Sequence, residues 1–161
     1  MCTRLVLALR LSLVLGLLVA FIPASPAQAG PIKLEAFLSG ANVVDANGNS
    51  SRGDPDGSGL GLITLNPGPD RPNSGSICFN ITVNNVDLTG VAVTINDGRK
   101  GKLGTTLVTL PTTFVNGKAE GCATADRDVI NRLKKKFKKF NLTVATTAFP
   151  GGALRAQFRR N

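Results

Sequence analysis

The chain has 161 residues and a formal net charge of +9, and it contains no histidine, tryptophan or tyrosine. Without histidine it lacks the imidazole ligands that copper and catalytic zinc sites use, and it lacks the most common general base of enzymes. The absence of tryptophan and tyrosine argues against aromatic stacking on bases or sugars, and we expect no nucleic-acid partner.

Residues 1–29 have the features of a secretory signal peptide. Arg4 and Arg10 give a positively charged start, and residues 11–22 form an apolar run that is short for a membrane span. Residues 27–29, Ala-Gln-Ala, supply small side chains at the expected cleavage positions. The alternative is an uncleaved membrane anchor.

The mature chain, residues 30–161, is expected to form one domain in the periplasm or the extracellular space and not to span a membrane. Removal of the signal peptide leaves Cys78 and Cys122, an even pair in an oxidising compartment. Each falls in an expected strand, so we predict a disulfide between them. The sequence has no Cys-x-x-Cys pair, which argues against thioredoxin-like redox chemistry.

Short stretches of alternating apolar residues follow one another along the mature chain. Alternation at every second position is typical of half-buried β-strands, and turn signals rich in Gly, Pro, Asn and Asp separate the stretches. One such signal, Asp97-Gly98, predicts a tight turn. We predict strands at residues 32–38, 59–66, 76–84, 90–96, 105–110, 113–116 and 118–124.

Residues 141–158 predict a β-hairpin that closes the fold. Apolar and polar residues alternate in both halves, and Pro150-Gly151-Gly152 supplies the turn. In the second strand Arg155 and Gln157 alternate with the apolar residues, so we place them on the opposite face.

One amphipathic helix is predicted near residues 126–139, between the strands. Asp126 is a suitable N-cap, and Val129, Ile130, Leu133 and Phe137 recur at helical spacing. The expected fold is therefore mainly β: an antiparallel Greek-key β-sandwich or barrel, Ig-like or superoxide-dismutase-like, with this single short helix.

The other face of the predicted helix is strongly basic. Residues 127–161 carry ten Lys and Arg and one Asp, whereas residues 30–126 carry seven Lys and Arg and nine Asp and Glu. Such clusters bind heparin-like polyanions or anionic lipid surfaces, and Arg155, Arg159 and Arg160 could extend the field. The alternative is a solvated helix face that keeps the protein soluble. The predicted anion-binding residues are Arg132, Lys134, Lys135, Lys136, Lys138 and Lys139.

Residues 41–59 are rich in Asn, Asp, Gly and Ser and predict a long surface loop. A calcium site is one hypothesis for this loop, with turn chemistry as the alternative. Ser50 replaces the glycine of an EF-hand loop, and no helix flanks the segment. Residues 52–54 form an Arg-Gly-Asp triplet of the integrin-binding type, which occurs often by chance. The candidate calcium ligands are Asp45, Asn47, Asn49 and Asp56.

Four segments resemble the chordin-type (CHRD) domain family, in the family's order and over nearly the whole mature chain. The most specific is Phe-Pro-Gly-Gly-x-Leu-Arg-x-Gln. The resemblance implies an extracellular, mostly β domain, and is closest to secreted, single-domain members of bacterial type, for which it implies no established enzymatic activity. The segments are Phe37–Asn42, Asp54–Gly59, Ile77–Phe79 with Gly121-Cys122, and Phe149–Gln157.

The chain departs from this family at one place. Many members carry a His-x-His-x-Gly element, similar to that of copper-zinc superoxide dismutase, and a further histidine in the penultimate strand. The aligned positions here are Thr94, Asn96 and Ala145. We therefore expect no cofactor, no copper or zinc, and no enzymatic activity; the glutamates, Glu35 and Glu120, fall in separate strands and form no dyad.

Three hypotheses of function remain. The first is a secreted, non-catalytic β-sandwich that binds or scaffolds an unidentified ligand, such as a secreted protein. The second is a surface or adhesion module whose basic helix binds acidic polysaccharide or an anionic membrane. The third is a degenerate metal-binding sandwich that has lost its histidine ligands and holds a hard cation in the loop at residues 45–56.

Overall fold

A computed structural model describes residues 30–68 and 74–161, so the expected signal peptide lies outside the described residues. The helical elements are the α-helix α1 (Arg127–Lys136) and the 3-10 turns η1 (Gly40–Asn42) and η2 (Phe137–Lys139). The strands are β1 (Ile32–Ser39), β2 (Ser58–Asn66), β3 (Ser74–Asn84), β4 (Ala92–Asp97), β5 (Thr105–Leu110), β6 (Lys118–Asp126), β7 (Phe140–Ala145), β8 (Leu154–Gln157) and β9 (Arg159–Arg160).

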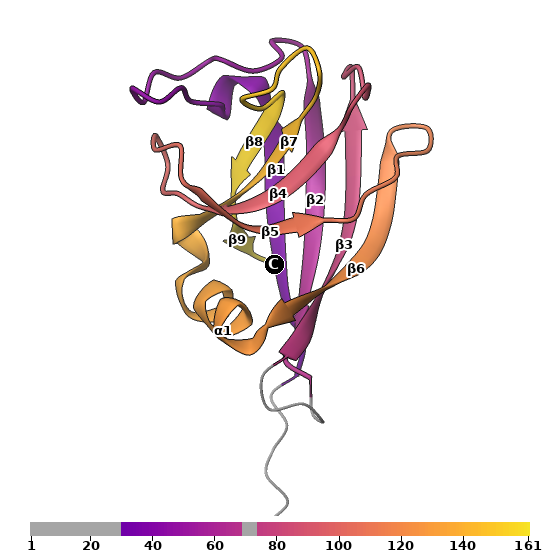
Figure 1. The fold of residues 1–161 in the computed structure, drawn as a ribbon, viewed down its shortest axis with the longest axis vertical. Helices are drawn as coiled ribbons and strands as arrows, with labels where there is room; N and C mark the ends of the chain where they lie inside the picture. The colour runs from indigo at the N-terminus through magenta and orange to yellow at the C-terminus, as the bar shows by residue number, and fades with distance from the viewer. Residues whose placement is uncertain (1–29, 69–73) are drawn as a thin grey trace, which may run out of the picture.

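The strands pair antiparallel in the order β5-β4-β7-β8-β1-β2-β3-β6, and β9 pairs with β1. From β3 the chain crosses to β4 and β5 and then returns to place β6 beside β3, which is a Greek-key connection. Figure 1 shows the sheet curling into a nearly closed barrel with the helix at one end. The predicted mainly β, Greek-key architecture is confirmed.

Alternate residues of the strands fill the barrel. In β3 the side chains of Ile77, Phe79, Ile81 and Val83 are buried, as the alternation predicts, and Asn80 between them is exposed. Fully burying one such side chain contributes roughly 1.5–3 kcal/mol to folding. The free energy gained by burying these apolar side chains therefore fixes which face of β3 points inward.

The helix α1 packs its apolar stripe against the ends of β2, β3 and β6. Ile130 and Leu133 have no exposed area, and Val129 and Phe137 are half-buried, as predicted. Asp126 occupies the N-cap position, but its side chain makes no capping hydrogen bond. No helix in residues 30–68 and 74–161 has the length and apolarity that crossing a membrane would need.

The strand predicted at residues 113–116 does not form. In this segment Val115 makes an isolated bridge with Lys118. Asn116 and Gly117 both have positive φ, 49° and 74°, which is the geometry of a type I′ turn. This turn reverses the chain directly into β6, so the residues before it gain no partner strand.

The tight turn predicted at Asp97-Gly98 is also wrong. Asp97 ends β4, and residues 98–104 form a longer connection to β5. Positive φ falls later in this connection, at Gly101 and Gly104. Gly98 is instead required by close packing, because a Cβ there would lie 2.7 Å from the Cα of Gly104.

The C-terminal hairpin forms as predicted, with β7 paired to β8. Arg155 stands on the opposite face from Leu154 and Ala156, but it is only 4% exposed, whereas we had expected an exposed arginine. The connection at residues 98–104 covers this part of the outer face and accepts hydrogen bonds from Arg155. Strand alternation gave the correct side of the sheet, but it does not report what covers that side.

The predicted disulfide is present. Cys78 in β3 and Cys122 in β6 stand directly opposite each other in register, with their Cα atoms 3.9 Å apart. Both lie on the outer face of the sheet, where Cys122 is exposed. The bond therefore joins the last two strands of the sheet order covalently.

The loop between β1 and β2 packs on the C-terminal hairpin through backbone atoms. The amide of Asp54 donates to the carbonyl of Ala153 at 2.9 Å, and the amide of Gly53 donates to the carbonyl of Gly40 at 3.3 Å. A Cβ on Gly40 would lie 1.8 Å from the carbonyl oxygen of Asp54, and one on Gly53 would lie 2.3 Å from that of Ala153. Only glycine permits this approach.

We predict that Gly40→Ala lowers the free energy of unfolding by about 1–3 kcal/mol or more, because backbone must move to admit the methyl group. Gly151→Ala is the matched control, since a Cβ at Gly151 meets nothing within 4 Å. That control should stay within about 0.5 kcal/mol of wild type. Urea unfolding of the three proteins measures both effects, and equal midpoints for the two variants would contradict the close approach.

We predict that the protein carries the Cys78–Cys122 bond in solution after folding under oxidising conditions. Its intact mass should fall short of the reduced chain by two hydrogen atoms, and reduction should lower the free energy of unfolding. For a sequence separation of 44 residues the loop-entropy model gives about 4 kcal/mol. Two thiols that react with iodoacetamide in the native protein would contradict this assignment.

Candidate functional site

A row of polar side chains crosses the outer face of β4, β7 and β8. The row consists of Thr94 and Asn96 on β4, Thr143 and Asn141 on β7, and Arg155 and Gln157 on β8, each in register with its neighbour. Asn96, Asn141 and Arg155 are buried although they lie outside the barrel core. Buried polar groups need hydrogen-bond partners, so these contacts define the geometry of the site.

Asn96 is the centre of the row on β4. Its Nδ2 lies 3.1 Å from the Oγ1 of Thr94, 3.1 Å from the Oγ1 of Thr143 and 3.3 Å from the Oδ1 of Asn141. The hydroxyl of Thr106 on β5 donates to the Oδ1 of Asn96 at 2.9 Å. Both ends of this amide are therefore hydrogen-bonded to neighbouring strands.

Asn141 connects the row to the loop at residues 98–104. It has no exposed area, and its Nδ2 donates to the carbonyl of Gly98 at 2.9 Å. The hydroxyl of Thr143 donates to its Oδ1 at 2.9 Å. Leaving such a buried amide unsatisfied would cost about 1–3 kcal/mol, so Asn141 holds the start of the loop against the sheet.

The two polar residues of β8 hold the same loop. The Nε2 of Gln157 lies 3.0 Å from the carbonyl oxygen of Gly98 and 3.1 Å from that of Phe140. The Nη2 of Arg155 donates to the carbonyl of Arg99 at 3.2 Å and to that of Lys102. Burial lowers the pKa of the Arg155 guanidinium below its ordinary value.

The row does not fit copper or zinc. Thr94 and Asn96 present a hydroxyl and an amide that are already hydrogen-bonded, and the side chain of Ala145 has no ligand atom. Among residues 30–68 and 74–161, no three His, Cys, Asp or Glu side chains gather into a group that could hold a metal ion. Both metals prefer imidazole, thiolate or carboxylate ligands, which this row lacks.

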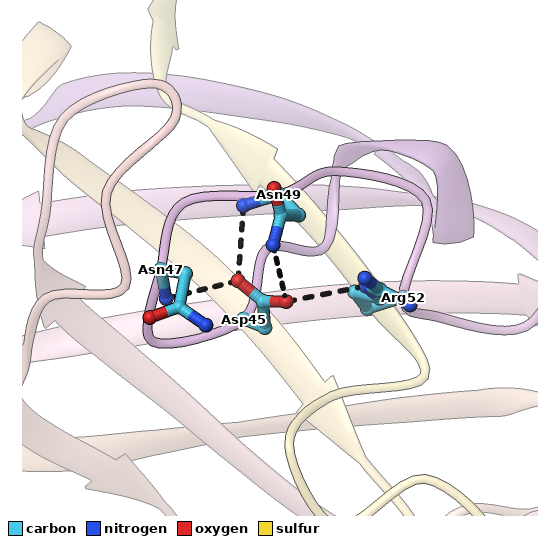
Figure 2. Close-up of polar contacts among 4 residues, drawn as sticks. All are labelled: Asp45, Asn47, Asn49 and Arg52. Carbon is cyan, nitrogen blue, oxygen red and sulfur yellow. Dashed lines mark hydrogen bonds and ion pairs between the residues drawn. The ribbon is translucent and has the colours of Figure 1, made fainter.

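The loop at residues 41–57 brings three of the candidate calcium ligands together, but in a hydrogen-bonded turn (Figure 2). The Oδ1 of Asp45 accepts the backbone amides of Asn47 and Asn49, each at 2.9 Å. The Oδ2 accepts the Nδ2 of Asn49 at 2.9 Å and pairs with the Nε of Arg52 at 3.3 Å. These hydrogen bonds, led by that of the Asn49 side chain, hold the pKa of Asp45 below its ordinary value.

Asp56, the fourth candidate, is exposed and lies beside Asp54 in the same loop. Burial, together with the neighbouring Asp56, raises the pKa of Asp54 above its ordinary value. Asp54 is 8% exposed, so the Arg-Gly-Asp triplet buries its aspartate instead of presenting it. The hydrogen bonds of Asp45 are those of a loop turn, and calcium binding by this loop stays a prediction.

The predicted anion-binding residues lie along α1 and η2 at one end of the barrel. Lys135, Lys136 and Lys138 are exposed, whereas Lys134 and Lys139 are half-buried. Arg132 is exposed, but it pairs with the carboxylate of Asp97 and lies 5.6 Å from the ring centroid of Phe140. The structure thus leaves a smaller cluster of solvated cations than the sequence predicts, which we call the lysine cluster: Lys135, Lys136 and Lys138.

The three arginines that could extend the basic surface of the helix, Arg155, Arg159 and Arg160, lie in different surroundings. Arg155 is buried under the loop at residues 98–104 and adds nothing to the exposed face. Arg159 and Arg160 are exposed; Arg159 lies 5.4 Å from the ring centroid of Phe37, and Arg160 lies 6.0 Å from that of Phe137 in η2. Only Arg160 therefore contacts the basic helical segment.

The anchoring roles of Asn141, Gln157 and Arg155 were not predicted from the sequence. A signal for two of them exists, because Leu-Arg-x-Gln is part of the specific segment at residues 149–157. The alternation of these two polar side chains by itself is typical of a solvated outer face and does not reveal the loop that covers them. Asn141 carried no comparable signal, since the sequence places it simply at a strand start.

The comparison with known proteins agrees with this architecture. A model of the CHRD domain matches residues 34–158, which include every strand from β2 to β8 and most of β1. No curated protein and no solved structure matches the chain.

We predict that protein purified without chelator carries no stoichiometric copper or zinc, because the polar row supplies only hydrogen-bonded amides and hydroxyls and one cationic guanidinium, and both cysteines are joined. Elemental analysis by inductively coupled plasma mass spectrometry measures this directly. A second sample, incubated with each metal and then desalted, controls for loss during purification. One transition-metal ion retained per chain would contradict the prediction.

Proposed function

The chain belongs to the CHRD domain family, and from this premise we propose that it is an exported, non-catalytic binding domain. The disulfide on the barrel surface is consistent with an oxidising compartment, and residues 1–29 are the proposed export signal. The polar row supports a binding or scaffold role, because its amides and hydroxyls supply no general base and no activated nucleophile. A bacterial-type single-domain protein of the periplasm or extracellular space fits these features.

The lysine cluster is the observation that carries a more specific proposal: this domain binds an acidic polymer through the end of the barrel formed by α1 and η2. The three ammonium groups are exposed, and no described carboxylate forms an ion pair with any of them. Ile130 and Leu133 hold the helix against the barrel, so the charges stand on a rigid support.

The proposed ligand is an acidic polysaccharide. Phe137 is half-buried within the cluster, and the exposed large apolar residues, Phe37, Leu62, Leu103 and Val115, come from other elements. A helix that inserts into a membrane needs an exposed apolar face as well as a basic one. The buried apolar stripe of α1 therefore favours a soluble polyanion over a lipid bilayer.

We predict that a triple variant elutes from a heparin column at clearly lower salt than wild type. In this variant Gln replaces Lys135, Lys136 and Lys138. Exposed charges are screened within about 8 Å at physiological ionic strength, so wild-type retention itself should fall steeply with salt. Glutamine keeps helix propensity close to that of lysine, and circular dichroism should show an intact fold.

The Leu133→Ala variant tests whether a loss of stability alone changes binding to heparin. It removes a fully buried side chain, so it should lower the free energy of unfolding by about 2–5 kcal/mol while elution from heparin stays near the wild-type salt. Cosedimentation with anionic vesicles provides the lipid comparison. If the triple glutamine variant elutes with wild type, the lysine cluster is only a solvated surface and the proposal is wrong.

A further inference from the structure

A pocket of about 450 Å³ lies between two loops on the outer face of β8. One wall comes from the loop after η1, the opposite wall from the connection at residues 98–104, and the floor from β8. The two loops meet closely, because a Cβ on Gly48 would lie 3.1 Å from the carbonyl oxygen of Gly101. Figure 1 shows both loops beside β8, on the same side of the barrel.

Three cations line the pocket, from the connection to β5, from β8 and from β9. Lys100 comes from the connection at residues 98–104, Arg155 from β8 and Arg159 from β9, and the lining includes no Asp or Glu. Asp45 lies in the loop that forms one wall, but its carboxylate is occupied by Asn47, Asn49 and Arg52. The field inside this pocket therefore attracts anions.

Arg155 is the least satisfied cation of this set. It is 4% exposed, and its Nη2 reaches the carbonyls of Arg99 and Lys102. Its Nη1 is buried and has no hydrogen-bond partner within residues 30–68 and 74–161, and no described carboxylate pairs with it. A guanidinium has five donors in a planar fork that matches carboxylate and sulfate oxygens, and burying it without a counterion is unfavourable.

The lining also offers an apolar surface. Phe37 on β1 is 51% exposed, with the guanidinium of Arg159 lying 5.4 Å from its ring centroid, and Val44 and Ala156 lie nearby in the lining. A volume of this size exceeds what an inorganic ion needs and is within the range of small-molecule sites. Asn42 and Ser50 add neutral hydrogen-bonding groups at the wall.

We propose that this pocket binds an organic oxyanion about the size of one sugar ring, with a carboxylate or sulfate paired to Arg155 and the ring packed toward Phe37. Lys100 and Arg159 contribute charge at the mouth, where both are exposed. An acidic sugar fits this chemistry, either free or as one unit of a polysaccharide. The pocket shares no lining residue with the lysine cluster, although Gln157 of the lining donates to the backbone carbonyl of Lys138 at 3.1 Å. The two binding sites are therefore separate sets of side chains, and each is tested by its own variants.

The test is a titration of the exported protein, labelled with ¹⁵N, with sodium glucuronate at constant ionic strength. The backbone amides of Gly48 and Gly101 report on the pocket, and their resonances should shift with saturation. Glucose is the uncharged control and should leave them in place, and inorganic sulfate tests the oxyanion without a ring. A heparin-derived disaccharide compared with a longer fragment distinguishes a free acidic sugar from a polymer unit.

Substitutions at two exposed positions of the pocket test its charges without disturbing the fold. Lys100→Gln and Arg159→Gln should each weaken glucuronate binding about two- to fivefold, as expected for partly solvated ion pairs. Lys118→Gln removes an exposed charge on β6, outside both the pocket and the lysine cluster, and should leave the affinity unchanged. Arg155→Lys keeps the charge but loses the planar fork, so it should weaken binding about tenfold or more, with circular dichroism confirming that the variant is folded.

The proposal is overturned if glucuronate shifts the two reporter amides no more than glucose does. It is also overturned if Lys100→Gln and Arg159→Gln bind with the affinity of wild type. Equal affinities for sulfate and glucuronate would refute the contribution of the ring and hence the assignment to an organic ligand. Loss of heparin binding in the lysine-cluster variant with unchanged glucuronate binding would show that the two surfaces act separately.

Discussion

The carbonyl oxygen of Gly98 is the acceptor on which the outer face of this barrel depends. Asn141 and Gln157, from two neighbouring strands, both donate to it, and Arg155 donates to two carbonyls further along the same loop. Buried donors must find acceptors, and here the backbone of residues 98–104 supplies them. The side chains of the sheet therefore set the path of the loop, and the loop in turn forms a wall of the pocket.

This arrangement has an electrostatic consequence. Backbone carbonyls offer only partial negative charge, so they hydrogen-bond the guanidinium of Arg155 without neutralising it. Arginine stays protonated at any pH the protein meets, and so the fold keeps a full positive charge at the base of the pocket. The exposed lysines of α1 and η2 are different, because water solvates them and salt screens them. A ligand that pairs with Arg155 gains affinity because the local dielectric constant is low. A ligand of the lysine cluster gains affinity mainly from the number of its charges.

Sequence patterns correctly predicted the elements that bury one face in the core and expose the other face to solvent. The alternation in β3 and the stripe of α1 each report a single buried face, and both are confirmed. The strand predicted at residues 113–116 failed for a local reason, the turn at Asn116-Gly117. The errors on the outer face share another cause, which is contact with segments distant in sequence. The exposure of Arg155 depends on a loop more than 50 residues earlier, since its partner Lys102 lies 53 positions away. The hydrogen bonds of Asn96 with Asn141 and Thr143 likewise depend on the register of β4 with β7, which no local pattern contains.

Asn96 joins three strands without an imidazole. An amide such as Asn96 donates and accepts at once, so it joins β4, β5 and β7 in the way a neutral imidazole could. Unlike imidazole, it does not titrate near neutral pH and binds transition metals poorly. The amides and hydroxyls of the polar row therefore keep one protonation state near neutral pH. Binding at either surface should consequently follow the charge of the ligand and the salt concentration.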